Sequence, residues 1–84
     1  MLIDVTNVIP KDDFILFLEF ENGEKGEFDC KTLFDKKPFQ VLQDKHFFKK
    51  AKNAFGTVIW NDEIDISPET LYIESKKIVE STID

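Results

Sequence analysis

The chain has 84 residues, a net charge of −6, eleven lysines without any arginine, and one cysteine. Its length suits a single domain, residues 1–84, and its nine phenylalanines can build a compact core without disulfides. The composition excludes an intrachain disulfide and a cysteine-based zinc centre, and it opposes general nucleic-acid binding. No window approaches the roughly 18 apolar residues of a membrane span, and the first residues lack a secretion signal, so we expect a cytoplasmic protein without a membrane partner.

The first half of the chain predicts strands joined by short turns. Residues 2–9 are rich in β-branched types and stop at Pro10, which suits the end of a strand. A polar turn follows, and apolar side chains then alternate over residues 14–20, which predicts a second strand. Ile15 and Phe17 occupy the other face of that strand. Because both faces are apolar, another element or a partner must cover the second one.

The turn after this strand predicts the register of a hairpin. A loop of Glu21, Asn22 and Gly23, with Gly23 in the left-handed conformation, places apolar side chains opposite each other and an acid opposite a base. The pairs expected from this loop are Leu16 with Phe28, Phe14 with Cys30, and Glu19 with Lys25. A two-residue Asn22-Gly23 loop would instead set Leu16 opposite Asp29, so we prefer the longer loop.

The middle of the chain predicts helical segments. Residues 30–38 are interpreted as a helical turn and loop, after which Phe39, Val41 and Leu42 return to the core. Asp44 is a suitable N-cap for a short amphipathic helix over residues 45–52.

The last third predicts a hairpin and a helix. Ala54 and Phe55 are expected to add a strand edge, and residues 57–60 and 64–66 form a hairpin through residues 61–63. Ser67 caps a C-terminal helix in which Pro68 is the first residue. The tail, residues 75–84, stays open between a continued helix, an edge strand and a frayed end. Its apolar residues Ile78, Val79 and Ile83 are candidates to cover Ile15 and Phe17.

These elements together predict an α+β fold. The expected order is a three-stranded meander, a short helix, a β-hairpin and a short C-terminal helix. We expect a small, mostly antiparallel sheet in a single layer, packed by the helices.

Three segments of the chain carry a family resemblance: LEFENGEKGEFDCKTLF, PFQVLQDKHFFKKA and VIWNDEIDISPETLY. In this order they resemble the small bacterial family catalogued as domain of unknown function 2442, over a core of about residues 2–73. The matching positions are Gly23, Asp29, Leu33, Phe39, Leu42, Phe47, Trp60, Asp65, Ile66, Pro68 and Leu71. Glu63 stands where the family pattern has glycine, which would cost about 1 kcal/mol if that position needed a positive φ.

The resemblance implies no established activity. Family members look like standalone small proteins or domains joined to helix-turn-helix units, and some are encoded beside another small protein in arrangements suggestive of toxin–antitoxin pairs. The chain ends too soon after the shared domain to hold a helix-turn-helix unit, so direct reading of DNA is not implied.

The candidate sites do not assemble into a catalytic, cofactor-binding or metal-binding set. His46 has no nucleophile or metal-ligand spacing beside it, and Cys30 is expected to be a small buried hydrophobe. The acidic residues between Asp62 and Glu69 lack the spacing of a calcium loop. The family-motif residues that we expect to be structural are Gly23, Asp29, Trp60, Asp65, Pro68 and Leu71. The candidates for an interaction surface are Ile15, Phe17, Phe48, Trp60, Lys49 and Lys50, with Phe48 and Trp60 open between core and interface.

The charge distribution supports two functional hypotheses. Residues 31–52 hold seven lysines against two aspartates, 7 − 2 = +5, so the remainder carries −11. Such asymmetry can steer a charged partner or promote self-association between opposite ends. The first hypothesis is a non-enzymatic protein-interaction module, the adaptor or antitoxin-like half of a two-gene pair. A homodimer with an isologous strand or sheet contact would satisfy the same apolar surface of the second strand. The alternative is a nucleic-acid accessory that uses residues 31–52. A small-molecule ligand has no sequence signal.

Overall fold

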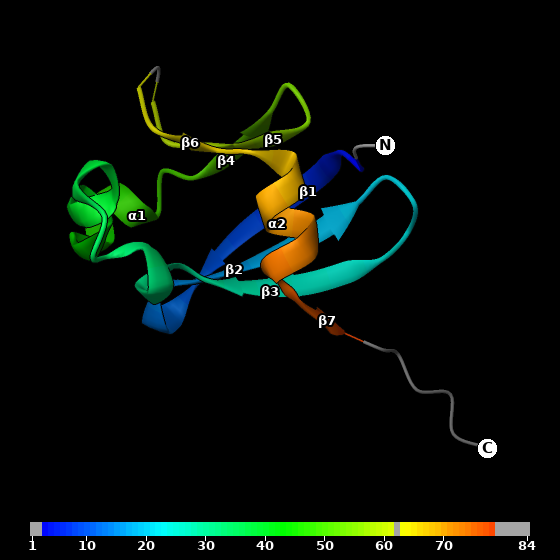
Figure 1. The fold of residues 1–84 in the computed structure, drawn as a ribbon, viewed down its shortest axis with the longest axis horizontal. Coiled ribbons are helices and arrows are strands. Elements are labelled where there is room, and N and C mark those ends of the chain that lie inside the picture. The colour runs from blue at the N-terminus through cyan, green and yellow to red at the C-terminus, as the bar shows by residue number, and fades with distance from the viewer. Residues whose placement is uncertain (1–2, 62, 79–84) are drawn as a thin grey trace.

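The computed structural model describes residues 3–61 and 63–78 (Figure 1). Its elements are β1 (Val5–Lys11), η1 (Asp12–Phe14), β2 (Ile15–Phe20), β3 (Lys25–Asp29), η2 (Cys30–Leu33), η3 (Lys37–Gln43), α1 (Lys45–Phe48), β4 (Lys52–Ala54), β5 (Thr57–Ile59), β6 (Asp65–Ile66), α2 (Pro68–Glu74) and β7 (Lys76–Ile78). The η elements are 3-10 helices, which are tighter than α-helices and usually short. The prediction of an α+β fold is confirmed.

Two antiparallel sheets are present within the described residues, where a single layer was expected. Strands β1, β2, β3 and β7 form a four-stranded sheet in that order, and β4, β5 and β6 form a three-stranded one. The second sheet is separate because, among the described residues, its strands pair only with one another. One backbone hydrogen bond links it to β1: the Val5 amide donates to the Gly56 carbonyl at 2.8 Å.

The hairpin register predicted for β2 and β3 is confirmed. Leu16 lies opposite Phe28 and Glu19 opposite Lys25, and Gly23 has the left-handed φ of +88° that the three-residue loop requires. The expected pair of Phe14 with Cys30 is wrong. Phe14 belongs to η1 with φ +61°, which takes it out of the strand before the ladder begins at Ile15.

The core lies between the inner face of the four-stranded sheet and the elements packed on it. Its most deeply buried side chains come from both sheets and from the helical segments: Leu16, Leu18, Phe28, Leu42, Phe48, Val58 and Leu71. Trp60 is also buried, and its Nε1 donates to the Phe48 carbonyl at 3.0 Å. Phe48 and Trp60 are therefore core residues, which answers the question that the sequence left open.

The helix caps agree with the sequence, while two boundaries differ. Asp44 accepts from the amides of His46 and Phe47, but α1 ends at Phe48 because the chain enters β4 at Lys52. Ser67 accepts from the Thr70 amide, and Pro68 begins α2. Phe55, expected in a strand edge, lies instead in the turn between β4 and β5.

The tail forms an edge strand where it is described. Strand β7 pairs with β3, with Ile78 opposite Lys25. Ile78 therefore sits at the sheet edge and does not cover Ile15 and Phe17, while Val79 and Ile83 lie outside the described residues.

The turn at Glu63 does not need glycine. Glu63 does not have a positive φ, so a non-glycine residue costs no strain there. Asn61 Oδ1 accepts from the backbone amides of Glu63 and Ile64 in this turn.

Candidate functional site

A pocket opens between η1 and α1, two elements that lie toward the left of the molecule in Figure 1. Its cavity volume is about 380 Å³. The lining consists of two phenylalanines at the base, three lysines at the rim, one histidine and two aspartates: Phe14, Phe48, Lys11, Lys45, Lys49, His46, Asp12 and Asp13. We refer to it as the lysine-rimmed pocket.

The wall formed by η1 has an unusual backbone. Asp13 and Phe14 have φ values of +63° and +61°, a region that L-residues rarely adopt and that costs about 1–2 kcal/mol per residue. Lys31 holds this turn: its Nζ donates to the Asp13 carbonyl at 2.7 Å and lies 3.1 Å from Asp13 Oδ2 and 3.2 Å from Asp29 Oδ1. Hydrogen bonding to the Asp13 carboxylate raises the pKa of Lys31, with a further contribution from Asp29.

The left-handed turn directs the Phe14 ring onto two other aromatic rings. Phe14 meets Phe34 edge to face, with ring centroids 5.2 Å apart, and Phe48 at 5.4 Å. Pairs of this geometry contribute about 0.5–1.5 kcal/mol beyond the area they bury. Phe14 remains half-buried while Phe48 is 2% exposed, so Phe14 supplies most of the aromatic surface that a ligand could reach.

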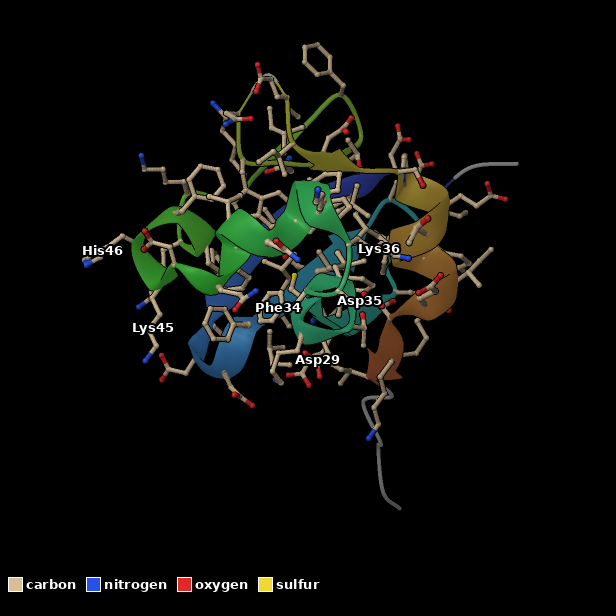
Figure 2. All side chains as sticks on the ribbon, turned by 60° about the vertical axis from the view of Figure 1, so that its left-hand side comes forward. Asp29, Phe34, Asp35, Lys36, Lys45 and His46 are labelled. Atoms are coloured by element: carbon tan, nitrogen blue, oxygen red, sulfur yellow. The ribbon has the colours of Figure 1, made fainter. Side chains whose placement is uncertain are left out.

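The other wall is α1 with its cap. Lys45 and Lys49 are four residues apart and therefore lie on the same side of the helical turn. Figure 2 shows Lys45 and His46 extending outward from α1, next to the η1 turn. The exposed His46 side chain lies apart from the thiol of Cys30, which is fully buried in the core.

The pocket is positive although the chain is negative. The lining residues include three lysines and two aspartates, 3 − 2 = +1, against −6 for the whole chain. The ion pair with Lys31 occupies the Asp13 carboxylate. A ligand suited to this arrangement combines an aromatic or aliphatic group for Phe14 with negative charge for the lysines.

The expected interaction residues Ile15 and Phe17 lie on a different surface, the outer face of the four-stranded sheet. Phe17 is opposite Ile9, which is 45% exposed, and Ile15 is opposite Asp29. Both Ile15 and Phe17 are half-buried, and the Lys11 ammonium lies 5.3 Å from the centre of the Phe17 ring. A lysine stem thus shields part of this apolar strip.

The remaining candidate residues are either surface lysines or family-motif residues with structural contacts. Lys49 is on the pocket rim, whereas Lys50 lies over the Phe47 ring at 5.9 Å and does not line the pocket. The family-motif residues make structural contacts. Asp29 caps η2 by accepting from the Lys31 amide at 2.9 Å. Leu71 is fully buried, Pro68 starts α2, and Asp65 is exposed beside it.

Sequence reasoning named part of the pocket and missed the rest. Phe48 and Lys49 were candidate interaction residues, and Lys45 lies in the lysine-rich segment, whereas Phe14 was expected inside a strand and Lys11 in a turn. The thirty residues between η1 and α1 explain why the two walls were not brought together. The one available signal was the pair of aspartates before Phe14, because aspartate tolerates left-handed backbone better than most residues.

Comparison with known proteins identifies one family. The family model described as Protein of unknown function (DUF2442) matches residues 5–77. No curated protein and no solved structure matches the chain. Residues 3–61 and 63–78 contain no group of three or more His, Cys, Asp or Glu side chains placed to hold a metal ion. No helix in the same described part is long and apolar enough to cross a lipid bilayer.

Proposed function

The chain belongs to this family of proteins of unknown function, and for it we propose a non-enzymatic role as a cytoplasmic protein-interaction module. The pocket between η1 and α1 binds an aromatic side chain that a partner protein presents among acidic groups. The observation that carries the proposal is the half-buried Phe14 ring, held by a strained turn inside a rim of Lys11, Lys45 and Lys49. In the cell the module would act as the adaptor or antitoxin-like half of a two-gene pair.

Two features disfavour nucleic acid as the partner. Phe48, a candidate for base stacking, is buried. The alternative role, a nucleic-acid accessory, relies on the half-buried Phe47 ring for stacking, and the Lys50 ammonium already lies over that ring, 5.9 Å from its centre.

The test is a titration of the ¹⁵N-labelled chain with a capped pentapeptide that carries one phenylalanine between two pairs of aspartates. We expect amide shifts confined to η1 and α1, with a dissociation constant on the order of 1 mM, which corresponds to about −4 kcal/mol. The same peptide with alanine in place of phenylalanine, or with lysines in place of aspartates, should bind at least about tenfold more weakly, a loss of about 1.4 kcal/mol.

A matched pair of variants locates the binding. Lys45→Glu with Lys49→Glu should abolish the shifts, while Lys36→Glu with Lys37→Glu makes the same charge change at exposed positions outside the pocket and should preserve them. Binding of a pyrimidine oligonucleotide without binding of the peptide would overturn the proposal in favour of the nucleic-acid role.

A further inference from the structure

The β4–β5 turn presents an exposed phenylalanine. Phe55 is 96% exposed and has a φ of +55°, and the next residue, Gly56, has +79°. Two positive φ values in a two-residue loop are typical of a turn in which asparagine or aspartate usually precedes glycine. Phenylalanine at this position strains the backbone and buries nothing within the described chain, so neither turn formation nor core packing explains it.

The fold holds this turn in a fixed place. The Gly56 carbonyl accepts from the Val5 amide at 2.8 Å, and Asn53 Nδ2 donates to the Thr6 carbonyl at 3.2 Å. Both bonds tie the β4–β5 hairpin to β1. Phe55 is therefore presented on an ordered support, which lowers the entropy that a contact would cost.

Two carboxylates lie close to this turn. The Asp4 carboxylate lies against Gly56, so close that a Cβ on the glycine would fall 2.6 Å from it. Glu21 Oε2 accepts from the Asp4 backbone amide at 3.0 Å, so a second carboxylate lies against the backbone of Asp4. Such charges disfavour an anionic membrane or a nucleic acid, and they favour an apolar socket with a basic rim.

The chain itself carries a socket of this kind. We propose that the lysine-rimmed pocket receives Phe55 from a second copy of the chain, so that Phe55 meets Phe14 while Asp4 and Glu21 face the rim lysines. This inference rests on the proposed function and names the partner of the same pocket. Among the described non-glycine residues, positive φ occurs at Asp13, Phe14 and Phe55, which are the residues of the two turns that would meet. Backbone strain of this kind gathers at functional sites.

The contact joins two different surfaces. The pocket is lined from η1 and α1, whereas Phe55 lies in the β4–β5 turn, and Figure 1 shows η1 at the lower left and this turn at the top. A pair of copies joined by one such contact therefore keeps one unused Phe55 and one unused pocket, and association proceeds head to tail. Because a single aromatic anchor carries most of the contact, the dissociation constant should lie in the range of roughly 10 μM to 1 mM.

Sedimentation velocity over about 10 μM to 1 mM protein tests the inference. The weight-average sedimentation coefficient of the wild-type chain should rise with concentration. Phe55→Asn removes the anchor, and Lys45→Glu with Lys49→Glu removes the rim, so each variant alone should remain a monomer. The Lys36→Glu, Lys37→Glu control should associate like the wild type.

Mixing the two defective variants gives the sharpest result. Phe55→Asn keeps its pocket and the Lys45→Glu, Lys49→Glu chain keeps its anchor, so their mixture should form a one-to-one dimer that grows no further. A wild-type chain that stays monomeric at about 1 mM, a mixture that stays monomeric, or a Phe55→Asn variant that still associates would overturn the inference.

The same variants separate this inference from the proposed function. If the wild type stays monomeric but Phe55→Asn binds the aspartate-flanked phenylalanine peptide at η1 and α1, the pocket binds a different protein and only the second-copy inference fails. If neither the peptide nor a second copy binds, both fail.

Discussion

Replacing Phe55 by asparagine should make the monomer more stable. The left-handed conformation costs an ordinary L-residue about 1–2 kcal/mol, and asparagine adopts it at a lower cost. Because Phe55 is 96% exposed, removal of the ring forfeits almost no buried area. We therefore expect the free energy of unfolding to rise by about 0.5–1 kcal/mol. For a domain of this size that corresponds to an increase of about 2–8 °C in Tm.

Urea denaturation measures the change, followed by the fluorescence of the buried Trp60. The protein should be kept near 1 μM, below the proposed association range, since self-association would stabilise the wild type by mass action. Phe55→Ala is the matched control: it removes the ring but retains the strain, so its stability should stay within about 0.5 kcal/mol of the wild type.

A Phe55→Asn variant that is no more stable than Phe55→Ala would refute the reasoning. That result would mean that the positive φ at this turn carries no cost that asparagine can relieve, and the argument from strain at the proposed contact would lose its basis.

Two substitutions and one labelling reaction test the packing. Gly26→Ala should lower the free energy of unfolding by about 1–3 kcal/mol and increase amide exchange in β7, because its Cβ would lie 2.9 Å from Ser75 Oγ; unchanged exchange would contradict the close approach of β7. Trp60→Phe should cost about 1–3 kcal/mol in urea denaturation through the lost bond to the Phe48 carbonyl and the smaller ring. Burial raises the pKa of the Cys30 thiol to about 12, so an aromatic disulfide reagent at pH 8 should leave it unmodified until the chain is unfolded in urea.

The sequence predicted the local parts of the fold and lost accuracy where pairing depends on distant residues. The register of β2 and β3 followed from alternating apolar residues and one turn glycine, Gly23, and the caps Asp44 and Ser67 were visible because capping is a matter of neighbouring residues. The separate sheet of β4, β5 and β6 was not predicted. Its strands have only two or three residues, too few for a periodic pattern to decide which sheet they join.

The candidate site was less predictable than the fold for the same reason. The run from Phe14 to Phe20 reads as one strand, yet Phe14 turns away because Lys31 and the rings of Phe34 and Phe48 hold η1 in a left-handed turn. Apolar patterns identify residues that a core needs. They do not identify a phenylalanine such as Phe55, which the fold exposes.

Salt concentration can separate the electrostatic and the apolar contributions to the proposed contact. Attraction between Asp4 and Glu21 on one copy and the rim lysines on another acts over the Debye length, about 8 Å at physiological salt and about 3 Å at 1 M. The insertion of Phe55 beside Phe14 is apolar and does not weaken with salt. High salt should therefore lower the association of the wild type without removing it, whereas Phe55→Asn should remove it at every salt concentration. The acids would then set the orientation of the two copies, and the strained phenylalanine would supply most of the affinity.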